Sequence, residues 1–138
     1  MSSKFESSVK HIPYAQQKVY GMLSDLSNIE RVKDRLPQDK VKDLSFDSDR
    51  VSISVAPVGQ VALHIVEREE PKCIKFETEK SPVAANLWIQ LLPVTETSCK
   101  IKLTIKADIP FMIKGMVSKP LTDGIEKIAD ILAMIPYE

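Results

Sequence analysis

Two histidines are the residues in this sequence best suited to acid–base chemistry near neutral pH. His11 ends the alternating stretch KFESSVKH, residues 4–11, on the same predicted face as Phe5 and Val9. His64 shares a face of its own strand with Ala62 and Val66, which is the predicted outward face. No Asp or Glu stands at metal-ligand spacing from either histidine, so we expect two structural histidines rather than a pair. His11 stays a candidate ligand contact because it is predicted to face inward.

The other reactive groups also lack a catalytic pattern. Cys73 and Cys99 are the two cysteines, too far apart for a zinc site, and we expect reduced, buried or half-buried thiols. The sequence contains no Gly-x-Ser-x-Gly turn and no glycine-rich phosphate loop. A Ser-His-Asp site is recognised by geometry, so it stays open at this point. We expect no catalytic residue, metal or cofactor.

The candidate residues sit on segments whose side chains alternate with a period of two, which predicts strands. Short connections between consecutive strands, such as PVG at 57–59, predict antiparallel hairpins. The seven predicted strands are 4–11, 40–46, 50–56, 60–69, 72–79, 85–94 and 99–108. Their inward faces are nearly all apolar: Phe5, Ser7, Val9, Val51, Ile53, Val55, Val61, Leu63, Ile65, Ile74, Phe76, Thr78, Ile101, Leu103 and Ile105.

Two short helices are predicted between the first and second strands. Pro13 suits the first turn of one helix. The second is predicted over 28–37, with Asn28 as its N-cap and Pro37 past its end.

A long helix is predicted at the C-terminus and is the one element long enough to cover the sheet. Its apolar stripe recurs every three or four residues: Ile113, Val117, Leu121, Ile125, Ile128, Leu132 and Ile135. Pro120, with Gly115 and Gly124, interrupts the pattern, and a proline inside a helix costs about 3 kcal/mol. Either the helix continues through Pro120 with a weak point, or it restarts there with Ser118 as N-cap.

Composition narrows the class of protein. A chain of 138 residues with 43% hydrophobic and 28% charged residues predicts one soluble globular domain over 1–138. Lys plus Arg and Asp plus Glu are equal at 19 each, which argues against a nucleic-acid partner. No apolar run reaches the roughly 18 residues of a membrane span, and the N-terminus lacks a signal-peptide core. We therefore expect a cytoplasmic protein without an integral membrane segment.

The order of elements resembles a known superfamily. FESSVKHIPYAQQKVYGMLSDLSNIERV at the start and GMVSKPLTDGIEKIADIL at the end are similar to the helix-grip (SRPBCC) superfamily. That superfamily includes START lipid-transfer domains, the major birch pollen allergen and bacterial polyketide cyclases. Small bacterial single-domain members are most alike, over essentially the whole chain. The resemblance implies an α+β fold: a curved seven-stranded antiparallel sheet around a long C-terminal helix, with two short helices after the first strand. It also implies a cavity between sheet and helix, and it leaves the function open.

The apolar inward faces favour binding over catalysis. Cyclase chemistry needs positioned proton donors and acceptors, whereas the interior offers little beyond Ser7, His11 and Thr78. We expect a carrier for a small hydrophobic ligand, namely a lipid, isoprenoid, sterol-like or aromatic molecule. The candidate ligand-binding residues are His11, Leu63, Ile74, Phe76, Trp88, Leu103, Phe111, Met112, Met116, Leu121 and Ile125.

The sequence leaves several alternatives open. The cavity could be filled by core side chains, the protein could be a cyclase or aromatase using the same cavity, or it could be a protein-interaction module. Trp88 lies in a strand with apolar residues on both faces, so it faces either the cavity or a partner, and a homodimer is possible. Phe111, Met112 and Met116 are predicted to gate one end of the cavity.

Overall fold

The computed structural model describes residues 2–31, 41–55, 59–80, 84–135 and 137. The helices are α1 (Gln16–Leu23), the 3-10 helix η1 (Leu26–Arg31) and α2 (Phe111–Met134). The strands are β1 (Ser2–Glu6), β2 (Lys10–Ile12), β3 (Val41–Phe46), β4 (Arg50–Val55), β5 (Gly59–Glu69), β6 (Cys73–Lys80), β7 (Ala85–Thr95) and β8 (Ser98–Asp108).

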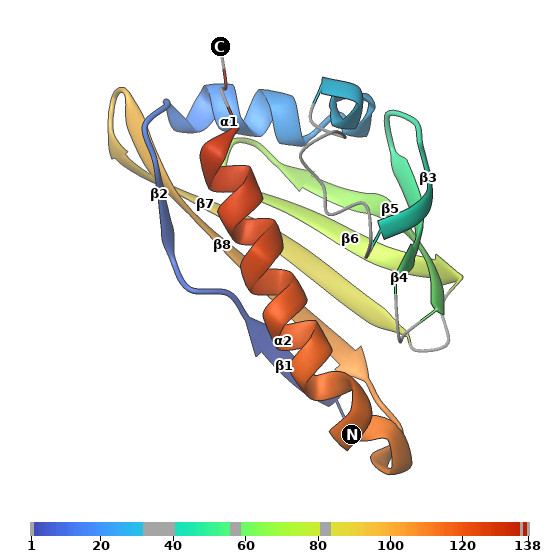
Figure 1. Ribbon diagram of the computed structural model, residues 1–138. Helices are drawn as coiled ribbons and strands as arrows, with labels where there is room; N and C mark the ends of the chain where they lie inside the picture. Colours follow the sequence, from blue (N-terminus) through green and yellow to red (C-terminus); the bar gives the residue numbers. More distant parts are fainter. Residues whose placement is uncertain (1, 32–40, 56–58, 81–83, 136, 138) are drawn as a thin grey trace.

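All the strands join one antiparallel sheet in the order β1-β8-β7-β6-β5-β4-β3, and β2 also pairs with β8. The sheet curves around α2, while α1 and η1 lie across the end where α2 finishes (Figure 1). The prediction of an α+β fold with an antiparallel sheet around a long C-terminal helix is confirmed. The predicted turn at 57–59 falls largely outside the described residues.

The first predicted strand is two strands, because its pairing with β8 shifts by one residue. Glu6 pairs with Thr104, whereas Lys10 pairs with Ile101. Four steps along the first segment therefore correspond to three steps along β8. Such an extra residue is the mark of a β-bulge, and a shift of one residue exchanges the two faces of a strand.

The shift overturns the predicted facing of the segment after β1. Val9 is 53% exposed and His11 is exposed, whereas Ile12 is fully buried. The prediction that Val9 and His11 face inward is wrong, because the alternation seen in residues 4–11 does not continue in space.

The same shift turns Lys10 toward α2. The Lys10 Nζ lies 2.5 Å from Glu126 Oε2 and 2.8 Å from Asp130 Oδ1. The Ser8 amide donates a 2.8 Å hydrogen bond to Glu126 Oε1, and the Ser8 hydroxyl donates to the other carboxylate oxygen. Hydrogen bonds from Lys10 and then Ser8 lower the pKa of Glu126 to about 2. These contacts attach α2 to the β1–β2 edge of the sheet.

The short helical region after β2 differs in detail from the prediction. η1 begins at Leu26, so Asn28 lies inside it and is not its N-cap. Asp25 Oδ1 instead accepts hydrogen bonds from the Ser27 amide, at 3.0 Å, and from the Ser27 hydroxyl. The Asn28 Nδ2 donates a 2.9 Å hydrogen bond to the Met22 carbonyl. The predicted helix end at Pro37 lies outside the described residues.

α2 is one continuous helix that contains Pro120. Ser118 is not an N-cap, since its hydroxyl donates back to the Lys114 carbonyl at 2.6 Å. Pro120 has no amide hydrogen, so the carbonyl of Met116 lacks its usual helical partner. Of the two alternatives, the structure therefore shows a continuous helix with a weak point. At the other end, the buried Tyr137 donates a 2.6 Å hydrogen bond to the Leu132 carbonyl.

The hydrophobic core has two parts. The larger lies under α1 and the second half of α2, and includes Ile12, Val19 and Ile125. The smaller lies under the first half of α2 and consists of Phe5, Ala107, Ile109 and Val117, with partly buried neighbours.

We predict that Glu126→Gln makes unfolding less pH-dependent. The folded pKa lies below the ordinary value of 4.5, so this carboxylate contributes stability above about pH 5 and loses the contribution as the pH falls toward 2. The variant should be less stable than the wild type at pH 7, and the difference should shrink as the pH falls from about 5 through 2, as measured by chemical denaturation. Glu96→Gln, at an exposed turn, is the control and should follow the wild-type profile. A constant gap between Glu126→Gln and wild type at every pH would contradict the assignment.

Candidate ligand-binding cavity

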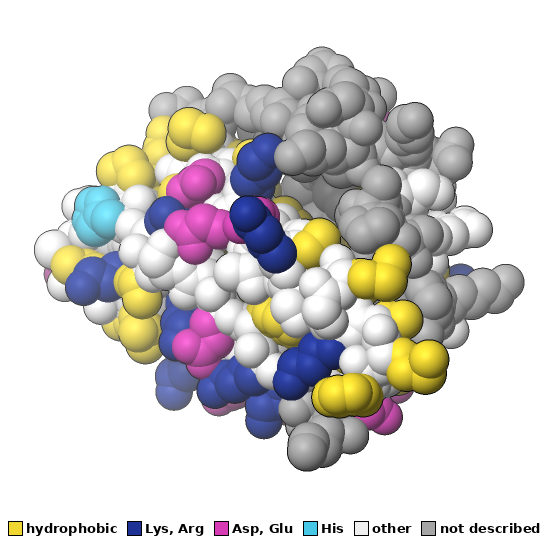
Figure 2. Space-filling view, turned by 60° about the horizontal axis from the view of Figure 1, so that its bottom comes forward, with side chains coloured by type: hydrophobic (Ala, Val, Ile, Leu, Met, Phe, Trp, Pro, Cys, Tyr) yellow, Lys and Arg dark blue, Asp and Glu magenta, His cyan; other side chains and the backbone are white. Residues whose placement is uncertain are grey.

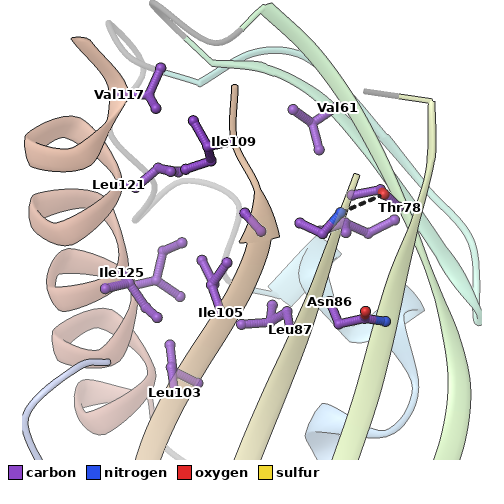
Figure 3. Close-up of a pocket in the computed structure, with 14 residues that line it drawn as sticks. Val61, Thr78, Asn86, Leu87, Leu103, Ile105, Ile109, Val117, Leu121 and Ile125 are labelled. Carbon is purple, nitrogen blue, oxygen red and sulfur yellow. Dashed lines mark hydrogen bonds between the residues drawn. The ribbon is translucent and has the colours of Figure 1, made fainter. Parts of the chain in front are cut away.

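A cavity of about 160 Å³ lies between α2 and the concave face of the sheet (Figure 3). β5–β8, the segment before α2 and α2 itself all contribute to it. Its fourteen lining residues are Val61, Leu63, Thr78, Ala85, Asn86, Leu87, Leu103, Ile105, Ala107, Ile109, Val117, Leu121, Ile125 and Ile128.

The cavity occupies the gap between the two parts of the core. Val117 belongs to the smaller part and Ile125 to the larger, and Leu121 lies between them on the same face of α2. On the sheet side of this gap, Ala85 of β7 pairs directly with Ala107 of β8. Two alanines opposite each other leave volume where the neighbouring Leu87–Ile105 pair fills it. The small side chains at this cross-strand position therefore contribute to the empty space.

The two polar side chains on the cavity wall, Thr78 and Asn86, each form a hydrogen bond. The Ala85 amide donates to Thr78 Oγ1 at 3.1 Å, and the Asn86 Nδ2 donates to the Phe76 carbonyl at 3.4 Å (the Thr78 bond is drawn in Figure 3). Among the lining residues of the described chain, none is titratable. The wall can thus exclude water and contact apolar surface, and it presents no general acid or base.

Four of the predicted ligand-binding residues line the cavity: Leu63, Leu103, Leu121 and Ile125. Ile74 and Phe76 point to the same side of the sheet, but they are buried within the larger part of the core rather than at the cavity wall. His11 is exposed at the β2 edge, away from the lining residues.

The predicted gate residues lie outside the cavity. Phe111, Met112 and Met116 are 91%, 90% and 66% exposed, and none of them lines it. The cavity wall on this part of α2 is formed instead by Val117 and Leu121.

Trp88 is on the convex face of the sheet. The Nζ atoms of Lys75 and Lys106 lie 5.5 Å and 5.9 Å from the centroid of its indole ring. Cations at this distance are attracted to the ring face. Of the two orientations left open by the sequence, Trp88 therefore takes the one directed away from the cavity.

Several further lining residues are predicted from the sequence to face inward, although they are not among the predicted ligand-binding residues. Val61, Thr78 and Ile105 were on predicted inward faces, and Val117 and Ile128 were on the predicted stripe. The remaining lining residues were missed: Ala85, Asn86, Leu87, Ala107 and Ile109. The sequence signal that points to this region is the presence of small side chains, Ala85 and Ala107, in strands of otherwise bulky residues.

The cysteines and His64 lie outside the cavity and do not form a reactive cluster in the described part of the chain. Cys73 is half-buried and Cys99 fully buried, both are free thiols, and burial raises the pKa of each. The Nδ1 of His64 lies 3.3 Å from Glu79 Oε1 without a hydrogen bond, while Arg50 contacts the same oxygen at 2.5 Å. The described residues contain no group of His, Cys, Asp or Glu able to hold a metal.

Comparison with known proteins adds structural likeness alone, since neither a protein-family model nor a curated protein matches this sequence. A norcoclaurine synthase point mutant from Thalictrum flavum, solved with a transition-state analogue, has a TM-score of 0.75 at 15% identity. The match covers 96% of this chain and 92% of that one. The chain has the helix-grip fold.

Bacterial proteins share this helix-grip architecture. A START superfamily protein from Mycobacterium smegmatis has a TM-score of 0.59 at 10% identity, covering 95% of this chain and 98% of that one. A conserved protein from Geobacillus kaustophilus has a TM-score of 0.62 at 16% identity, and the match covers 96% of this chain and 90% of that one. Among the described residues of this chain, no helix is long and apolar enough to cross a membrane.

We predict unequal costs for truncating two isoleucines on the cavity wall. Ile125 is 2% exposed, so Ile125→Ala should lower the free energy of unfolding by about 2–5 kcal/mol. Ile128 lines the same cavity but is 45% exposed, so Ile128→Ala should cost less than about 1 kcal/mol. Urea denaturation of both variants measures the difference, and equal losses would show that α2 is not seated as described.

Proposed function

We propose that this protein binds one small hydrophobic molecule between α2 and the sheet and releases it unchanged. The observation that carries the proposal is the apolar cavity whose described wall has no titratable side chain. Acid–base catalysis needs such a group within hydrogen-bonding reach of the substrate. The surroundings of the cavity therefore favour a carrier or sensor over a cyclase or aromatase. We further propose a cytoplasmic location, as expected from the sequence.

The volume of the cavity limits the ligand. Sites for drug-sized molecules measure about 300–1,000 Å³, whereas an apolar cavity of about 150 Å³ holds a molecule such as benzene. At about 160 Å³, this cavity suits one aromatic ring or a short branched chain. A sterol or a long acyl chain would require α2 to move away from the sheet. The proposal thus narrows the range expected from the sequence.

A structural neighbour supports the proposal of a small ligand. Norcoclaurine synthase from Thalictrum flavum was solved in complex with dopamine and hydroxybenzaldehyde, each of which contains one aromatic ring. That structure has a TM-score of 0.73 at 14% identity to this chain. The likeness lies in the fold, so it supports the binding of a small ligand by this fold and does not carry over the synthase reaction.

Native mass spectrometry of the protein purified from its own cells tests the proposal. We expect a bound species with about the mass of a single-ring or short-chain hydrophobe, released unchanged on denaturation. Leu121→Trp should abolish the bound species, because an indole on the cavity wall fills the space. Leu92→Trp makes the same chemical change at a 63% exposed site on β7 and should retain it. Apoprotein alone from wild-type cells, with no displaceable hydrophobic dye, would reject the proposal.

We predict that Pro120→Ala slows release of a hydrophobic dye from the cavity. Alanine restores the amide that can bond to the Met116 carbonyl, so the part of α2 beside Leu121 opens less often. Stopped-flow dilution of dye-loaded protein measures the release rate.

Gly115→Ala is the matched control for Pro120→Ala. Alanine favours the helix by about 1 kcal/mol over glycine. Apart from the adjacent residues and the backbone of α2 itself, a methyl group there would meet no atom within 4 Å. Because residue 115 precedes the cavity wall on α2, dye release should keep the wild-type rate. Equal rates in Pro120→Ala and wild type would show that Pro120 has no role in exchange.

A further inference from the structure

The N-terminal end of α2 presents an exposed apolar surface, which we call the α2 tip and define as residues 111–119. Phe111 is 91% exposed, Met112 is 90% exposed and Met116 is 66% exposed. Hydrophobic side chains gather beside basic ones on the end of the molecule where α2 begins (Figure 2). Three large apolar side chains so close in sequence and so exposed are uncommon on a soluble domain and indicate an interaction site.

The α2 tip is also basic, although the whole chain carries no net charge. Residues 111–119 contain Lys114 and Lys119 and no acidic residue, and the nearest acidic residues in sequence are Asp108 and Asp123. Both lysines are exposed, and neither forms an ion pair with a described residue. The surface therefore combines two features. Its apolar side chains can enter an apolar environment, and its positive charges can contact phosphate groups.

We propose that the α2 tip docks onto an anionic lipid bilayer. Phe111, Met112 and Met116 would enter the boundary between headgroups and acyl chains, and the two lysines would contact lipid phosphates. This is a peripheral contact, and it holds whatever molecule the cavity binds.

A second copy of the chain fits this surface less well. A stable protein interface buries roughly 800 Å² on each partner. An aromatic side chain such as Phe111 buries roughly 150–250 Å², and with two methionines the surface stays below that area. A bilayer needs no complementary groove, so a small projecting helix end suffices.

Docking at this end would bring the cavity close to the bilayer. Ile109, Val117 and Leu121 line the cavity and belong to the same stretch of chain as the α2 tip. A hydrophobic molecule leaving past these residues would enter lipid rather than water.

Co-sedimentation of the full chain with vesicles tests the docking. The wild type should bind vesicles of phosphatidylcholine with phosphatidylserine more tightly than vesicles of phosphatidylcholine alone, and added salt should weaken the binding. Phe111→Ser with Met112→Ser should weaken binding by at least about tenfold through lost apolar burial. Lys114→Gln with Lys119→Gln should weaken it by about fivefold per lysine.

The matched control is Leu92→Ser with Val94→Ser, which removes two exposed apolar side chains from β7. This variant should bind vesicles like the wild type. No binding of the wild type to anionic vesicles, equal binding of the Phe111→Ser/Met112→Ser variant, or equal loss in the β7 control would overturn the proposal. A dimer in sedimentation velocity that only the α2-tip variant dissociates, with no vesicle binding, would assign the surface to self-association instead.

Discussion

One helix covers the concave face of a sheet that is wider than the helix. An α-helix with its side chains is about 10 Å across, and strands are about 4.8 Å apart, so a helix spans roughly two strands. α2 packs against β1, β2 and β8, at one side of the sheet. The sheet must curve to bring β5–β7 toward the helix, and α1 closes only one end. The two-part core and the cavity between its parts both follow from this shortage of covering surface.

The position of α2 depends on the edge of the sheet as well as on apolar packing. The one-residue shift between β1 and β2 lets Phe5 face the core and, further along, directs Lys10 at Glu126 and Asp130. Apolar packing tolerates sliding, whereas these contacts have defined geometry. They fix the rotation of α2 at the turn that carries Ile125, which in turn sets which face of the helix meets the cavity.

Most of the fold was predictable because alternation and helical spacing report directly on which side chains share a face. The hairpins of β4–β8 and the stripe on α2 are of this kind. The facing of His11 was not predictable, since residues 4–11 alternate regularly and only pairing with β8 reveals the shift. The cavity was hidden for another reason: it depends on the summed volume of side chains from several elements, and Ala85 meets Ala107 only in the folded sheet. Met112 and Met116 were predicted at the cavity but are exposed, because the apolar character of a side chain does not show whether it is buried.

The location of Trp88 determines what intrinsic fluorescence can reveal. It is the only tryptophan of the chain, and its indole lies on the convex face between Lys75 and Lys106. A molecule entering the cavity is separated from that indole by the thickness of the sheet. Tryptophan emission is therefore a reporter of changes on the convex face, and a flat emission titration carries no information about occupancy of the interior.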